Sequence, residues 1–162
     1  MRVLDLFSGI GGFAYAGHLL GGFTTLDFVE IDPYCQKILR KNFPNVPIHD
    51  DITTFDTSFR FGEYDLITAG FPCQDLSSAG KQAGLGAGTR SGLFYRVMQI
   101  ARQVRPKFIL LENVANTISH NKGQTFQQIL HEIAQSGYNA EWGIVSARDV
   151  GGCHLRKRIW II

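Results

Sequence analysis

The chain has few cysteines, few charged residues and no long apolar run. Its three cysteines, Cys35, Cys73 and Cys153, form no C-x-x-C pair and lack metal-ligand spacing with the five histidines, so they predict neither a disulfide framework nor a metal site. No apolar run approaches the roughly 20 residues that cross a bilayer, and the start MRVLDLF lacks the features of a signal peptide. We therefore expect a cytoplasmic protein without membrane or metal, in which any functional cysteine acts singly.

The composition suits one ordinary domain of 162 residues, because hydrophobic residues make up 44% and charged residues 19% of the chain. This excludes disorder as the global state. The net charge of +2 hides an asymmetry, since residues 1–81 carry 6 Lys+Arg and 10 Asp+Glu, a net of −4, whereas residues 82–162 carry 10 and 4, a net of +6. The asymmetry favours a polyanionic partner that contacts the second half; charges scattered over a solvated surface are the simpler alternative.

Short apolar runs alternate with stretches of helical periodicity, a pattern typical of an α/β fold with a mostly parallel sheet and helices on both faces. The runs predict strands at residues 3–7, 25–31, 46–48, 64–70, 107–113, 138–145 and 158–162. The periodic stretches predict helices at residues 12–20, 33–42, 92–105 and 125–136. Residues 74–92 lack periodicity and are rich in small side chains, and we interpret them as a functional lid, with a disordered connection as the alternative.

A glycine-rich turn follows the first predicted strand. In DLFSGIGGFA, Gly9, Gly11 and Ala14 satisfy the G-x-G-x-x-G/A pattern of a nucleotide-binding loop. Glu30 ends the second predicted strand, where a carboxylate can bind both hydroxyls of a ribose, and Asp51 follows the third, where it could accept a hydrogen bond from an adenine amino group. The pattern predicts an adenosine-containing cofactor without separating a nicotinamide dinucleotide from S-adenosylmethionine. A turn or helix-packing role for the glycines is the alternative.

Two further strand ends carry chemically reactive side chains. In GFPCQDLS, Cys73 follows the fourth predicted strand, and in FILLENV, Glu112 ends the fifth, whose unbroken apolar run predicts burial on both faces. Ligands of open α/β sheets bind at this carboxyl edge, so Cys73 is a candidate nucleophile and Glu112 a candidate acid. The alternatives are an inert buried cysteine and a carboxylate that caps a helix.

These motifs resemble those of the DNA (cytosine-5)-methyltransferases. DLFSGIGG is similar to the family's cofactor motif, GFPCQDLS to its Pro-Cys motif, ENV to its Glu-Asn-Val motif, and HLRKR to its Gln-x-Arg-x-Arg motif, in the family's order along the whole chain. Leu76 stands where phenylalanine is more usual, and Cys153-His154 where Pro-Gln is commoner. The resemblance implies a Rossmann-like S-adenosylmethionine-dependent methyltransferase fold.

The resemblance also implies how the residues act on double-stranded DNA. The Cys73 thiolate adds to carbon 6 of a flipped-out cytosine, and Glu112, buried enough to hold a proton, meets N3. Arg156 and Arg158 steady the cytosine carbonyl and a phosphate, with surface ion pairs as the alternative. The loop of residues 74–92 closes on the base, with Lys81 and Arg90 near phosphates. The base that removes the carbon 5 proton is not identified. The residues implied to bind S-adenosylmethionine are Phe7, Gly9, Ile10, Gly11, Gly12, Glu30, Ile31, Asp51, Ile52, Pro72 and Leu93.

The resemblance covers only the N-terminal, catalytic portion of the family. A target-recognition domain and a final segment that returns to the catalytic domain follow the double-arginine motif in the family, and neither is found in residues 1–162. We therefore interpret the chain as a fragment of such an enzyme, a degenerate remnant, or one subunit of a two-chain enzyme. The enzyme would be of the restriction-modification type. Two other functions stay open: a NAD-dependent oxidoreductase, supported by the glycine pattern and Glu30 alone, and a non-catalytic DNA-associated protein.

Overall fold

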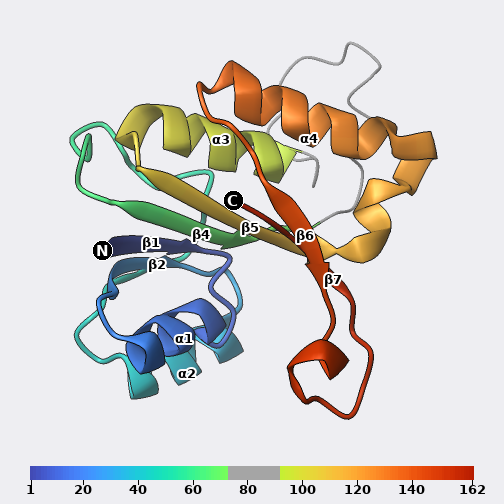
Figure 1. The fold of residues 1–162 in the computed structure, drawn as a ribbon. Coiled ribbons are helices and arrows are strands. Elements are labelled where there is room, and N and C mark those ends of the chain that lie inside the picture. Colours follow the sequence, from blue (N-terminus) through green and yellow to red (C-terminus); the bar gives the residue numbers. More distant parts are fainter. Residues whose placement is uncertain (73–91) are drawn as a thin grey trace. The chain divides into compact units, whose positions relative to one another are not determined.

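The computed structural model describes residues 1–72 and 92–162 (Figure 1). Cys73, Lys81, Arg90 and nearly all of the expected lid lie outside this part of the chain. The strands are β1 (Arg2–Leu6), β2 (Thr24–Val29), β3 (Ile48–His49), β4 (Leu66–Gly70), β5 (Phe108–Val114), β6 (Trp142–Val145) and β7 (Arg158–Ile161). The helices are α1 (Gly12–Leu20), α2 (Pro33–Asn42), α3 (Gly92–Val104) and α4 (Gln124–Gln135), with short 3-10 helices η2 (Ala115–Ile118), η3 (His120–Gly123) and η4 (Arg148–Val150).

The predicted α/β fold is confirmed. Hydrogen bonding joins the strands in the order β3-β2-β1-β4-β5-β7-β6, and β1 pairs in parallel with both β2 and β4. Helices α1 and α2 begin and end where the sequence predicts, while the three 3-10 helices were not expected. The sixth strand begins at Trp142 rather than at residue 138. Tyr138 instead contributes to the C-terminal cap of α4, because Gly137 adopts a left-handed conformation and the Tyr138 amide donates a hydrogen bond to the carbonyl of Ile133.

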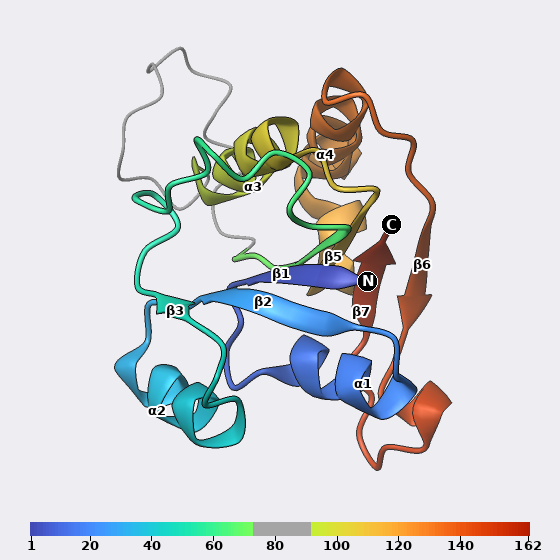
Figure 2. The same ribbon diagram turned by 90° about the vertical axis from the view of Figure 1, so that its left-hand side faces the viewer.

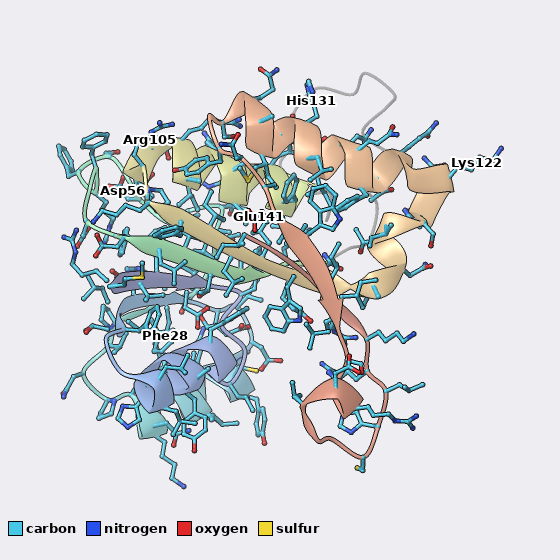
Figure 3. All side chains as sticks on the ribbon, in the orientation of Figure 1. Phe28, Asp56, Arg105, Lys122, His131 and Glu141 are labelled. Carbon is cyan, nitrogen blue, oxygen red and sulfur yellow. The ribbon has the colours of Figure 1, made fainter. Side chains whose placement is uncertain are left out.

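The chain divides into two compact units. The first comprises Met1–Gly70 and Gln99–Leu110 and contains the strands from β1 to β4. Helices α1 and α2 lie on the same side of β1, β2 and β3 (Figure 2). Phe28 of β2, labelled in Figure 3, is fully buried on this side and packs in one cluster with Ala14 of α1 and Leu39 of α2. Apolar side chains from two helices and one strand therefore form this layer of the core.

The opposite side of β2 carries a polar network centred on Asp27, which is only 3% exposed. Its carboxylate accepts hydrogen bonds from the hydroxyl of Tyr64 at 2.7 Å and from Nη1 of Arg60 at 3.0 Å, and its other oxygen lies 2.7 Å from Nε2 of His49. The Arg60 guanidinium also lies 5.1 Å from the ring centre of Phe55. The network satisfies a buried carboxylate and ties the segment after β3 to β2.

The second unit comprises Phe71–Met98 and Leu111–Ile162. In it, β7 runs antiparallel to both β5 and β6, and Figure 1 shows β6 and β7 side by side. The apolar face of α4 contributes Phe126, which packs edge-on against Trp142 of β6 at 5.2 Å. All residues of β6 are exposed, whereas Ile159 and Ile161 of β7 are buried. The buried apolar side chains of this hairpin therefore come from β7, while β6 leaves the apolar side chains of Trp142, Ile144 and Val145 exposed.

The expectation that the fifth strand is buried on both faces is wrong. In β5, the buried residues Ile109, Leu111 and Asn113 alternate with Phe108, Leu110 and Glu112, which are partly or fully exposed. In the described residues, no helix is long and apolar enough to span a bilayer, and no three His, Cys, Asp or Glu side chains are arranged to hold a metal ion.

Candidate active site

The glycine loop between β1 and α1 needs glycine at two positions. Gly9 and Gly11 have φ values of 55° and 90°, in the left-handed region that favours glycine. A Cβ at Gly11 would lie 2.8 Å from the side chain of Phe43, so this glycine allows the start of α1 to approach α2 closely. A Cβ at Gly9 would meet nothing within 4 Å, which leaves room for a ligand over the loop.

Glu30 holds this loop to the end of β2. Its side chain is 9% exposed, and its Oε2 accepts a hydrogen bond from the Gly9 amide at 2.7 Å. Its Oε1 accepts from the Asp32 amide at 2.8 Å. The predicted acidic residue thus contacts the predicted glycine loop directly, and the lone pairs that it keeps could accept from two ribose hydroxyls.

The other expected cofactor residues of the first unit differ in exposure. Ile10 and Ile31 are 58% and 71% exposed, so both offer apolar surface to a ligand, while Ile52 is buried. Phe7 is partly buried and has a φ of 55°, which makes it a strained residue at the point where the chain leaves β1. Asp51 accepts a hydrogen bond from the Thr53 amide at 2.8 Å, so this contact orients its carboxylate.

Asp5 is a buried acid below the loop that the sequence analysis did not select. It is fully buried, its Oδ1 accepts a hydrogen bond from the Thr68 hydroxyl at 2.6 Å, and its Oδ2 has no hydrogen-bond partner among the residues that the structure describes. Burial raises the pKa of Asp5 to about 7; the nearby Glu30 carboxylate adds to this rise and the Thr68 hydroxyl opposes it. An aspartate within the apolar run RVLDLF was the signal that could have revealed it.

In the second unit, Glu112 of β5 forms an ion pair with Arg158 of β7. Nε of Arg158 lies 2.6 Å from Oε1 of Glu112, and the side chains are 22% and 24% exposed. The carboxylate of Glu112 is therefore only partly buried, and the antiparallel pairing of β5 and β7 brings a guanidinium to it. An ion pair of this kind favours the ionised form of the carboxylate and holds it beside the guanidinium.

Asn113, the neighbour of Glu112, has a structural role in the same unit. It is buried, its Nδ2 donates to the carbonyl of Phe71 at 3.0 Å, and its Oδ1 accepts from the Val114 amide at 2.8 Å. Asn113 thus fixes the backbone just before Pro72. Pro72 and Leu93 are both partly buried.

Arg156 lies apart from the ion pair of Arg158 and Glu112, in the loop between β6 and β7. It is exposed and has a φ of 35°. In the same loop, Sγ of Cys153 lies 3.8 Å from Nδ1 of His154, and both side chains are exposed. A Cβ at Gly152 would lie 2.8 Å from the carbonyl oxygen of Ala147, so a glycine is needed where the loop folds against itself.

A mostly parallel sheet with a glycine loop after its first strand and a carboxylate after its second defines a Rossmann-like nucleotide-binding fold. The sequence profile of the C-5 cytosine-specific DNA methylases matches residues 1–162. The chain therefore belongs to this family, as its motifs suggested.

Among its relatives, Type II methyltransferase M1.ScrFI of Lactococcus lactis subsp. cremoris is 38% identical over 99% of this chain and 41% of its own length. Type II methyltransferase M.HpaII of Haemophilus parainfluenzae is 41% identical over 98% of this chain and 44% of its own length. The crystal structure of S. pombe Dnmt2 methyltransferase superposes with a TM-score of 0.75 at 27% identity, covering 99% of this chain and 48% of that chain. The chain thus spans about half the length of the relatives that it matches.

Proposed function

We propose that this chain is the cofactor-binding and catalytic part of an enzyme that transfers a methyl group from S-adenosylmethionine to carbon 5 of cytosine in DNA. The observation that carries the proposal is the family match over the whole chain, which includes all four motifs in the family's order. The contact of Glu30 with the Gly9 amide supports the nucleotide-binding half of the proposal, and the ion pair of Glu112 and Arg158 supports the catalytic half.

The first unit fits the adenosine part of S-adenosylmethionine. Glu30 would accept hydrogen bonds from the ribose hydroxyls, Asp51 would accept one from the adenine amino group, and Ile31 and Ile52 would flank the ring. The free space over Gly9 would admit the cofactor near the backbone of the loop. The cofactor supplies an electrophilic methyl group on its sulfonium. The remaining residues assigned to it are Phe7, Ile10, Gly11, Gly12, Pro72 and Leu93.

The catalytic residues activate the cytosine ring, because carbon 5 is a poor nucleophile on its own. The Cys73 thiolate would form a bond to carbon 6, which moves an electron pair onto carbon 5 and allows it to take the methyl group. Glu112 would meet the N3 edge of the ring, and Arg158 would hold the Glu112 carboxylate in orientation. Loss of the carbon 5 proton to a base then allows the carbon–sulfur bond to break and restores the thiolate. Arg156 would contact the cytosine carbonyl or a phosphate.

The substrate that we propose is double-stranded DNA from which the target cytosine is flipped out. Because the chain spans about half the length of its relatives, we propose that the segment that reads the base sequence lies outside residues 1–162, on the same polypeptide or on a second one. The described residues that would contact phosphates include Arg156 and Lys157, both exposed in the loop between β6 and β7. DNA binding by the 162-residue chain alone should therefore be weak, insensitive to base sequence and steeply dependent on salt.

Methyl incorporation from labelled S-adenosylmethionine tests the proposal. Residues 1–162 should methylate cytosine in DNA when the segment that reads the base sequence is present, and they should show no sequence-specific methylation alone. A covalent adduct with DNA that contains 5-fluorocytosine should form with the wild type and not with Cys73→Ala. Transfer to specific sites by residues 1–162 alone would refute the view that a further segment reads the base sequence.

Two results would favour the other functions. Binding of NAD in preference to S-adenosylmethionine, measured by calorimetry, would support an oxidoreductase, for which Glu30 and the glycine loop are the only features in favour. Binding of S-adenosylmethionine and DNA without adduct formation, even with the segment that reads the base sequence present, would support a non-catalytic DNA-associated protein.

A further inference from the structure

Asp5 occupies an unusual position for a carboxyl group. It lies in the middle of β1, paired in register with Phe28 of β2 and Thr68 of β4. Register partners in neighbouring parallel strands point to the same side of a sheet, so Asp5 faces the side of α1 and α2 with the apolar Phe28. One carboxyl oxygen accepts a hydrogen bond from the Thr68 hydroxyl and the other has no hydrogen-bond partner within residues 1–72 and 92–162, which is costly for a buried carboxylate.

The carboxyl group also lies below the predicted cofactor loop. Glu30 is two residues beyond Phe28 and so lies on the same side of the sheet as Asp5, one step nearer the carboxyl edge. The Glu30 carboxylate accepts a hydrogen bond from the Gly9 amide, and the Ser8 hydroxyl donates one to the main-chain carbonyl of Asp5 at 2.6 Å. Asp5, Glu30 and the loop therefore form one contiguous group.

The strand order sets the direction of a cofactor bound along this edge. Adenine at Asp51 would lie beyond β3 and the ribose at Glu30 beyond β2, so the methionine part would lie beyond β1, the strand that contains Asp5 and leads into the loop. That part of S-adenosylmethionine carries two cationic groups, the sulfonium and the α-ammonium. Both Glu30 and Asp5 are acids, and no lysine or arginine side chain bonds to either of them in the described part of the chain.

We propose that Asp5 holds a proton in the cofactor-free protein and releases it when the cationic methionine part of S-adenosylmethionine binds. The inference rests on the proposed function, since it takes this cofactor as the ligand. Its physical basis is that burial with one unpartnered oxygen favours the neutral form of a carboxyl, whereas a positive charge nearby favours the ionised form. Cofactor binding then becomes linked to pH.

Within the described part of the chain, few other titratable groups lie on the elements around Asp5. From β2 the charged neighbour is Glu30, since Asp27 points to the other side, and β4 has no titratable side chain in Leu66–Gly70. On α1, Tyr15 and His18 are exposed. From α2, Cys35 is partly buried, and burial together with Glu30 and Asp32 raises the pKa of its thiol, so it is neutral near pH 7.

The sign of the linkage follows from the raised pKa of Asp5, which is about 7. Below this pH the cofactor-free protein binds a proton that the complex has lost, so affinity should rise with pH. Between pH 6.0 and 7.5 the affinity for S-adenosylmethionine should rise about eightfold, and binding should release nearly one proton at pH 6.0 and about a quarter of one at pH 7.5.

Calorimetry in two buffers of different ionisation enthalpy measures this proton release, and a ¹³C NMR titration of the carboxyl carbons measures the Asp5 protonation without any ligand. Methylthioadenosine, which has neither cationic group, should bind without proton release. Asp5→Asn should bind the cofactor with no proton release and with an affinity that is flat between pH 6.0 and 7.5. Thr68→Val removes the hydrogen bond that lowers the Asp5 pKa, so proton release should persist to higher pH, while Thr68→Ser, the matched control, should behave as the wild type.

The outcomes separate the two proposals. Failure of the wild type to bind S-adenosylmethionine would overturn the proposed function and this inference with it. Tight binding without proton release, or unchanged release in Asp5→Asn, would overturn the inference and leave the proposed function intact. If Asp5→Asn does not fold, the comparison of Thr68→Val with Thr68→Ser decides, and an identical pH dependence of the two variants would overturn the inference.

Discussion

Replacement of Glu30 by alanine should damage both the cofactor site and the stability of the cofactor-free protein. The carboxylate accepts two backbone hydrogen bonds, from Gly9 at 2.7 Å and from Asp32 at 2.8 Å. A hydrogen bond to a charged group contributes about 1.5–3 kcal/mol. Because Asp32 is exposed and Gly9 is partly exposed, water can form some of the hydrogen bonds that these two amides lose. We therefore expect Glu30→Ala to lower the free energy of unfolding by about 2–4 kcal/mol.

For a chain of this length such a loss should lower the melting temperature by about 5–15 °C. Affinity for S-adenosylmethionine should fall about 10- to 100-fold, since the ribose loses a charged acceptor and the loop loses its support. Glu30→Gln keeps the volume and one acceptor oxygen, so its loss of stability should be about half as large. The control is Glu141→Gln, an exposed glutamate labelled in Figure 3, which should change stability by less than about 0.5 kcal/mol.

Urea unfolding without cofactor measures the stability, and titration calorimetry measures the affinity. An unfolding midpoint of Glu30→Ala equal to that of the wild type would refute the role of the carboxylate in holding the loop. Unchanged affinity would remove Glu30 from the cofactor site, whatever the effect on stability.

Three further predictions concern other parts of the chain. Tyr64→Phe should lower the free energy of unfolding in urea by about 1.5–3 kcal/mol, because the buried hydroxyl donates a hydrogen bond to Asp27. Burial and Asp27 raise the Tyr64 pKa far above its ordinary value, so the wild type should also lose stability as pH rises past about 10. Tyr64→Phe should lack this loss at high pH, and the control Tyr15→Phe, at an exposed tyrosine, should keep it. Cys73→Ser should abolish methyl transfer by the completed enzyme and leave S-adenosylmethionine affinity nearly unchanged; loss of binding in a folded variant would contradict the role of the thiolate. Ile144→Lys should reduce self-association of the isolated chain in sedimentation experiments, because β6 exposes an apolar strand, and unchanged association would exclude this strand as the contact.

Local sequence signals were sufficient to predict where α1 and α2, the helices next to the glycine loop, begin and end. Helix α2 begins at Pro33, as predicted, because Asp32 caps it by accepting from the amides of Tyr34 and Cys35, and proline has no amide to satisfy there. Helix α1 ends at Leu20 because Gly21 follows with a φ of 72°. In both cases the determining interactions lie within one turn of the helix end.

The sequence by itself also determined the family, since four motifs that resemble the family's occur in its order and the family profile matches residues 1–162. Only the tertiary structure decided which side chains meet. Glu112 forms an ion pair with Arg158 because β7 inserts antiparallel between β5 and β6, a pairing that the sequence pattern does not specify. Asp5 is a buried acid because β2 and β4 flank it in register. Such contacts join residues far apart in the chain, and the local periodicity that predicts strands and helices does not specify which strands pair.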